Sequence, residues 1–208
     1  MFSINYQAIT VVLALAWAAP AHAAHPAAEA TDRMLAEAIQ MANASASDSQ
    51  KFRAACNFVN GNIYASAIAN QLLGKYKNLA RDQKGIQTFL AVFPSILASK
   101  MYSKLGDAKG ASYRVYDNVR PRDKNTFEVP VSLRFDGNTY NAKMVVYGSG
   151  NNFALIDGMA FGMSGVAYLK KDTQKKLDAE YNKDPQNSLP VTELVKDEVS
   201  DSDFAYCN

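Results

Sequence analysis

The hydrophobic period of the chain changes near Gly106 and Gly110, and this change limits the possible folds more than any other feature. Before it, apolar residues recur at helical spacing. After it, apolar residues alternate with polar ones, as in Phe127, Val129, Val131, Leu133 and Phe135. A period near 3.6 predicts helices, and a period of two predicts strands with one buried face. The sequence therefore predicts an α+β fold with helices packed on a curled antiparallel sheet.

The helices are expected at residues 31–41, from Asp48 onward, from Asp82 onward, and at 166–181 and 190–199. Asp32, Asp48 and Asp82 each stand where an N-cap residue is expected. Pro94 falls inside the long helix that Asp82 opens. Because proline lacks a backbone donor, we expect a kink or a split there.

The strands are expected at residues 112–119, 127–135, 139–147 and 153–161, which form a four-stranded meander. Asp136-Gly137-Asn138 is typical of a tight hairpin turn. Pro130 lies inside the second of these strands, which favours an edge position or a bulge there.

Residues 1–23 have the pattern of a secretory signal peptide. A run of apolar and small residues ends at Pro20, and Ala21-His22-Ala23 fits a signal peptidase site. The alternative is a retained membrane anchor, since no Lys or Arg precedes the run. We expect cleavage, export to the periplasm, and one domain over residues 24–208. Residues 24–32 are expected to be a loose linker, and 200–208 a tail.

The chemistry available to the mature chain is limited by its histidines. The sequence has two, of which His22 leaves with the signal and His25 falls in the expected linker. Nucleophile systems and zinc sites usually need a well-placed imidazole. No phosphate-binding or dinucleotide-binding glycine motif is present. We therefore expect no catalysis, no metal and no cofactor. The net charge of +2 comes from scattered Lys and Arg residues, which does not favour nucleic acid as a partner.

The two cysteines, Cys56 and Cys207, leave two alternatives open. In an exported chain, an even number of cysteines permits a disulfide, which would tie the C-terminal tail to an early helix. The other interpretation is two unrelated thiols.

The last expected strand suggests an apolar cavity between the helices and the sheet. Bulky residues share one parity, namely Phe153, Leu155, Met159, Phe161 and Met163, while Gly158, Ala160 and Gly162 share the other. A bare face lets a helix or a ligand chain approach closely, and Met adapts to variable ligands. The alternative is a solid core.

Two segments resemble motifs of the MlaC family, the periplasmic phospholipid-binding proteins also called toluene-tolerance proteins. The first runs through Leu72-Leu73-Gly74-Lys75-Tyr76 and Asp82-Gln83 to Phe89 and Phe93. The second consists of Asp157, Gly162 and Ser164 at the end of the last strand. The order of elements over about residues 30–198 also agrees. The chain lacks the tryptophans that the family often has near Tyr76 and Phe153, so it resembles a distant member.

The resemblance implies a carrier that shuttles phospholipid, or a related apolar lipid, across the periplasm and supports the lipid asymmetry of the outer membrane. Its partners would be an outer-membrane lipoprotein complex and an inner-membrane ABC transporter complex with its substrate-binding subunit. We expect the wall of the lipid cavity to be formed by Phe89, Phe93, Leu97, Val129, Val131, Leu133, Met144, Leu155, Met159, Phe161 and Met163.

Three further interpretations remain open. Lys170, Lys171, Lys175 and Lys176 form a basic run, which is either a solvated face or a surface for anionic headgroups or an acidic partner. Asp157 could be a base in an isomerase-type enzyme of the nuclear-transport-factor-like fold, with Tyr102, Tyr113 or Tyr147 as donor, or it could anchor the strand end. The third is an envelope adaptor with a solid core and no lipid.

Overall fold

The computed structural model of the protein describes residues 24–199 and 206–207. The expected signal peptide and most of the expected tail lie outside the described residues. Within the described part of the chain, no helix has both the length and the apolar character needed to cross a bilayer.

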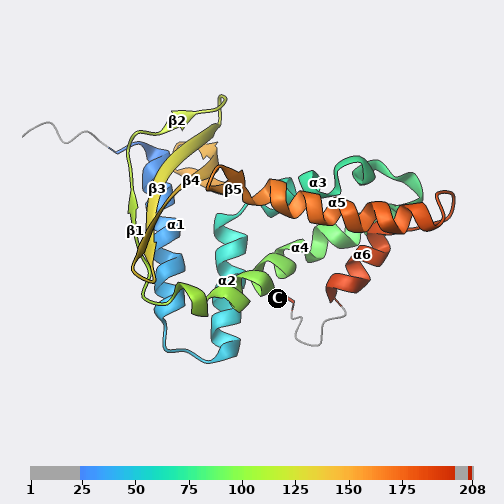
Figure 1. The fold of residues 1–208 in the computed structure, drawn as a ribbon, viewed down its shortest axis with the longest axis horizontal. Coiled ribbons are helices and arrows are strands. Elements are labelled where there is room, and N and C mark those ends of the chain that lie inside the picture. The colour runs from blue at the N-terminus through green and yellow to red at the C-terminus, as the bar shows by residue number, and fades with distance from the viewer. Residues whose placement is uncertain (1–23, 200–205, 208) are drawn as a thin grey trace, which may run out of the picture.

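The described residues form one antiparallel sheet at one end of the molecule and six α-helices, of which α1 lies against the sheet and several extend away from it (Figure 1). The helices are α1 (Pro26–Asn43), α2 (Asp48–Asn62), α3 (Ala65–Leu73), α4 (Gln83–Lys104), α5 (Gly165–Lys183) and α6 (Pro190–Val199). Three short 3-10 helices are η1 (Gly74–Asn78), η2 (Ala80–Asp82) and η3 (Gly106–Ala108). The strands are β1 (Ser112–Val115), β2 (Arg120–Pro121), β3 (Thr126–Phe135), β4 (Asn138–Ser149), β5 (Asn152–Ala160) and β6 (Met163–Ser164). The predicted α+β class is confirmed.

The sheet contains the predicted meander with two short strands added. Its order is β1-β3-β4-β5-β6, with β2 also paired to β3. Residues 112–119 do not form one strand, because β1 ends at Val115 and the chain pairs again only at Arg120. Pro130 lies opposite this break, in β3, which has neighbouring strands on both sides and is not an edge strand. Its carbonyl accepts a hydrogen bond from Tyr116 N at 3.0 Å, and its missing donor faces the break.

The first helix begins earlier than expected, and the prediction of a loose linker over 24–32 is wrong. Pro26 is its first residue, and His25 caps it by accepting a hydrogen bond from Ala27 N at Nδ1 (3.1 Å). His25 N donates to Asp117 Oδ1 at 2.6 Å. The linker expectation failed because alanine is a strong helix former, and small residues let this helix lie close to the sheet. His25 is therefore an ordered structural residue.

Helix α1 covers one face of the sheet, which we call the inner face. Ala27 and Ala28 are buried there against Val129 of β3 and Val146 of β4. The helix contacts β1, β3, β4 and β5. The opposite face is called the outer face below. Helices α4, α5 and α6 extend away from the sheet (Figure 1) and form a second, helical core with α3.

Two predicted helix caps take different roles in the structure. Ser47, not Asp48, caps α2, in a capping box with Gln50. Asp82 precedes α4 but makes no capping bond to it. Its buried carboxylate accepts hydrogen bonds from Val191 N (2.6 Å) and Thr192 N (3.2 Å), and so caps α6 instead. Helix α4 also runs unbroken through Pro94, so the proline does not split it.

The two cysteines form the Cys56–Cys207 disulfide, which confirms the first of the two alternatives. Cys56 is buried in α2, and Cys207 N donates a hydrogen bond to Ser95 Oγ of α4 at 2.9 Å. The bond therefore fixes the end of the chain to the helices, at a sequence separation of 151 residues.

Removing this bond should lower the stability of the protein. Closing so long a loop restricts the unfolded chain, and the chain-entropy model gives an upper figure of about 5 kcal/mol. We expect the Cys56→Ala/Cys207→Ala variant to unfold at lower urea concentration than the oxidised wild type. Dithiothreitol should weaken the wild type and leave the variant unchanged. Equal midpoints for oxidised wild type and variant would contradict the prediction.

Candidate functional site

A bulge in β5 decides which side chains face the helices. The pairing between β4 and β5 shifts at Val145/Val146, so that Val146 pairs with Leu155 while Val145 pairs with Asp157. The extra residue, Ile156, reverses the alternation. Leu155 therefore lies on the inner face and Met159 on the outer face. The prediction that these two residues share a face is wrong, because the bulge lies between them.

The small residues of β5 consequently lie on the inner face. Gly158 pairs with Met144, and Ala160 pairs with Ala142, both beyond the buried valines that contact α1. A methyl group placed on Gly158 would meet no atom within 4 Å, so the space above this glycine is open. We call Leu133, Ala142, Met144, Gly158 and Ala160 the inner strip.

The inner strip is apolar and incompletely covered. Val129, Val131 and Val146 are fully buried near α1. In contrast, Leu133 and Met144 are only partly buried, although register places them on the same face as those valines. Apolar side chains that remain accessible between two layers show that the helices do not close over this part of the sheet. The strip is therefore an apolar surface with open space above Gly158.

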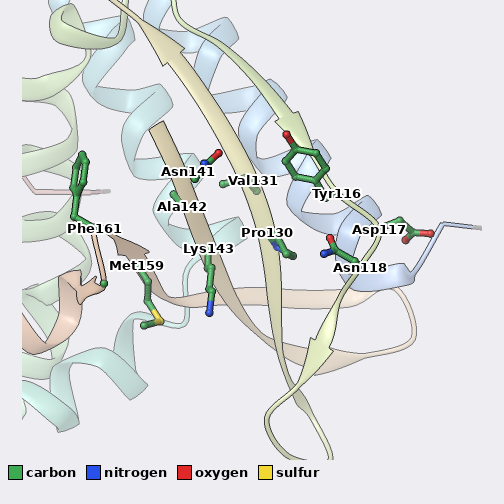
Figure 2. Close-up of a pocket in the computed structure, with 11 residues that line it drawn as sticks. Tyr116, Asp117, Asn118, Pro130, Val131, Asn141, Ala142, Lys143, Met159 and Phe161 are labelled. Atoms are coloured by element: carbon green, nitrogen blue, oxygen red, sulfur yellow. The ribbon is translucent and has the colours of Figure 1, made fainter. Parts of the chain in front are cut away.

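The outer face carries a pocket of about 650 Å³ (Figure 2), a volume within the usual range for small-molecule sites. Pro130, Lys143 and Met159 share its floor, and Phe161 stands at one side. Of the predicted wall residues, Val131, Met159 and Phe161 line it. Its walls are mostly apolar, and Asp117, Asn118 and Asn141 are among the polar residues that line it. This pocket can hold a ligand with both an apolar and a polar part.

A charged cluster that the sequence analysis did not identify lies beside this pocket. Glu128 accepts from Lys143 Nζ at 2.9 Å and from Arg122 Nε at 2.6 Å. These hydrogen bonds, the one from Lys143 first, lower the pKa of the Glu128 carboxyl. Arg122 Nη2 also lies 2.9 Å from Met159 Sδ. The alternation of β3 and β4 would have placed Glu128 and Lys143 on one face, but only the register shows that they pair.

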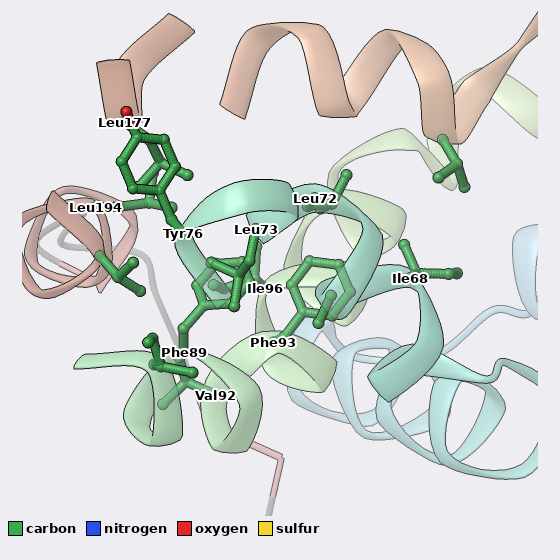
Figure 3. Packing of buried hydrophobic residues seen from close by; sticks show 14 residues of the cluster. Ile68, Leu72, Leu73, Tyr76, Phe89, Val92, Phe93, Ile96, Leu177 and Leu194 are labelled. Carbon is green, nitrogen blue, oxygen red and sulfur yellow. The ribbon is translucent and has the colours of Figure 1, made fainter. Parts of the chain in front are cut away.

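Of the three wall residues predicted on α4, two lie in the helical core and not on the sheet. Phe89 and Phe93 are buried in the helical core with Leu72 and Ile96 (Figure 3). With Leu97 they line a space of only about 50 Å³. Leu97 also packs on the cluster of α1, α2 and α4 residues that Leu155 contacts, so the structure brings these two predicted residues to one cluster. Met163 is largely exposed.

The motifs that suggested the resemblance form joints between elements. Tyr76 OH donates to Asp178 Oδ1 at 2.6 Å, and Lys75 Nζ lies 2.8 Å from the same atom, which lowers the pKa of Asp178. These contacts fasten η1 to α5. At the other motif, Asp157 Oδ1 accepts from Val166 N at 3.0 Å, and Ser164 Oγ accepts from Ala167 N at 2.9 Å. Both bonds cap the first turn of α5.

Comparison with known proteins places this fold. No family model and no curated protein matches the sequence. Among solved structures, the fold matches the phospholipid-binding protein from Ralstonia solanacearum, solved in complex with a phospholipid, with a TM-score of 0.61. The match covers 83% of this chain and 94% of that chain at 12% sequence identity. The chain has the fold of a phospholipid-binding protein. At this identity, the likeness establishes the fold, and the site must be argued from the residues of this chain.

The hydrogen bond from Val166 N gives the Asp157 carboxylate a structural role as a helix cap. Mutation can separate this role from that of a catalytic base. Tyr113, one of the proposed donors, instead donates to Asp32 O at 3.2 Å. We expect Asp157→Ala to lower the free energy of unfolding by about 1 kcal/mol, and Asp157→Asn, which keeps an acceptor, to cost less. Urea denaturation measures both, with Ser164→Ala as a matched cap control. A turnover lost in a stable Asp157→Asn protein would instead support the role of a base.

The Glu128 cluster should make stability depend on pH. Because the pKa of Glu128 is lowered in the fold from its usual 4.5, its contribution is present above that pH and is lost as the pH falls through the folded pKa. We expect Glu128→Gln to be less stable than wild type by about 1 kcal/mol at pH 7, with the gap closing as the pH falls below the usual 4.5 and through the lowered pKa of Glu128 in the fold. Asp107→Asn, at the exposed Lys104–Asp107 pair, is the control and should show almost no gap. A gap for Glu128→Gln that does not change with pH would contradict this.

Proposed function

We propose that this protein binds a phospholipid or a related apolar lipid, with the acyl chains lying against the inner strip. The observation that carries the proposal is the open space above Gly158, on an apolar face that the helices leave partly uncovered. The shared fold with a phospholipid-binding protein that was crystallised with a phospholipid supports it. The inner strip is favoured over the outer pocket because it lacks the Asp, Asn and Lys residues that border the pocket.

The physical need for such a carrier is large. Two acyl chains contain about 30 methylenes, and exposing each to water costs roughly 0.8 kcal/mol. A lipid therefore does not cross an aqueous compartment unaided at a useful rate. A protein that covers the chains offsets this cost and needs no reaction to do so. We propose that binding and release, not catalysis, are the activity of the protein.

The proposed setting is the periplasm. The signal-like segment of residues 1–23 supports export, and the Cys56–Cys207 disulfide suits an oxidising compartment. In this setting the carrier moves lipid between an outer-membrane lipoprotein complex and an inner-membrane ABC transporter complex with its substrate-binding subunit. The alternative of an adaptor without lipid makes a different prediction, namely a purified protein with no bound lipid.

Two methionines on adjacent strands provide a matched test of the lipid position. Met144 belongs to the inner strip, and Met159 lines the outer pocket. We expect native mass spectrometry of the protein, purified without detergent, to show an adduct of lipid mass. Met144→Trp should fill the open space and reduce the loaded fraction at least fivefold, while Met159→Trp should leave it unchanged. Circular dichroism of both variants checks the fold.

Each other outcome has a definite meaning. A loss of lipid in Met159→Trp alone would move the site to the outer pocket and contradict the assignment to the inner strip. A bare protein that also takes up no lipid from added liposomes would refute the carrier and favour the adaptor.

A further inference from the structure

Three large apolar side chains project from one short segment at the junction of the sheet and α5. Phe161, Tyr168 and Met163 are 74%, 73% and 66% exposed, more than any other large apolar residue in the described part of the chain. They fall within eight positions of one another. Exposed apolar residues gathered in this way mark a surface that contacts a partner or a membrane.

The backbone under Phe161 shows that folding alone does not favour this residue. Phe161 and Gly162 have φ of +54° and +75° in the turn between β5 and β6. The β3–β4 hairpin makes the same turn with Asp136 and Gly137, at +50° and +75°. Positive φ suits Asp, Asn and Gly, and is unfavourable for a bulky side chain. The Phe161 ring makes an edge contact with the Tyr140 ring, at 5.8 Å between centroids, and remains largely exposed.

Two lysines lie on the same stripe of α5 as Tyr168. Tyr168, Lys171 and Lys175 are spaced i, i+3 and i+7, so they lie on one stripe of the helix. Among the described residues, Lys171 and Lys175 have no carboxylate partner, whereas Lys176 is held by Glu198 at 3.0 Å. Asp172, an exposed residue next to Lys171 in the sequence, has its Oδ2 atom 3.9 Å from Lys176 Nζ. The stripe therefore carries an aromatic side chain near the start of α5 and positive charge one and two turns further along.

We propose that Phe161, Met163, Tyr168, Lys171 and Lys175, here called the docking tip, bind the surface of an anionic lipid bilayer. Aromatic and Met side chains enter the interface, and lysines one and two turns away meet the phosphates. The two lysines favour an anionic bilayer over a protein partner, because their charges complement a negatively charged surface and need no matching shape on it. The inference deepens the proposed function. Vesicle binding by the docking tip stands by itself, and the transfer of lipid to or from the bilayer rests on the proposed function. Phe161 directly follows Ala160, so docking brings the end of the inner strip to the bilayer.

The test is sedimentation of the disulfide-bonded mature protein with vesicles. Vesicles of phosphatidylethanolamine and phosphatidylglycerol should bind it, and vesicles of phosphatidylcholine alone should bind it much less. Lys171→Gln/Lys175→Gln should weaken binding roughly fivefold per lysine, and added salt should do the same. Phe161→Asn and Tyr168→Gln should each weaken it severalfold, and the asparagine suits the turn, so that variant should fold.

Lys124→Gln removes an exposed lysine from the β2–β3 loop and is the control for the loss of one lysine charge, to be compared with Lys171→Gln and Lys175→Gln as single variants; it should bind as the wild type does. Absence of wild-type binding to anionic vesicles would overturn the proposal and assign the surface to a protein partner. Equal binding by all variants would overturn it as well. Native mass spectrometry of the wild type reports lipid loading separately. Vesicle binding by a protein that holds no lipid and takes up none from the vesicles would refute the carrier and leave the docking tip standing.

Discussion

The single-residue bulge at Ile156 is the constraint on which the rest of the site depends. Without it, Met159 would face α1 and α2, and the side of the sheet that now carries Gly158 and Ala160 would be filled. With it, the bulky residues near the start of β5 complete the packed core, and the small residues near its end leave space. One inserted residue therefore divides the strand into a structural part and a part available to a ligand.

The general fold could be predicted because it depends on periodicity. The change from helical spacing to alternation located the sheet, and Asp136-Gly137 located its hairpin. The bulge could not be predicted, since an extra residue leaves no mark in a single sequence, and it reversed the faces of Leu155 and Met159. Phe89 and Phe93 were placed on the cavity wall from resemblance, but α4 packs them among helices. Periodicity identifies a buried face and does not identify the element that covers it.

The residues that suggested the family are mostly joints. Asp82 caps α6, Asp157 caps α5, and Tyr76 binds Asp178 across 102 positions of the sequence. Such groups are satisfied by backbone and side-chain partners far along the chain, so their spacing reports the fold more directly than it reports the ligand. This explains why motif resemblance led to the correct architecture, while the ligand-facing surface had to be derived from register and accessibility.

The disulfide has a topological consequence. Cys56 and Cys207 close a covalent ring that contains every described strand and all of α3, α4, α5 and α6. Helix α1 lies wholly outside this ring, and it is the helix that covers the inner face. The ring thus joins the sheet and the helical core covalently, while α1 is held on the sheet by packing and hydrogen bonds. A shift of α1 against the sheet would therefore change how much of the inner face is covered and leave every covalent link of the ring in place.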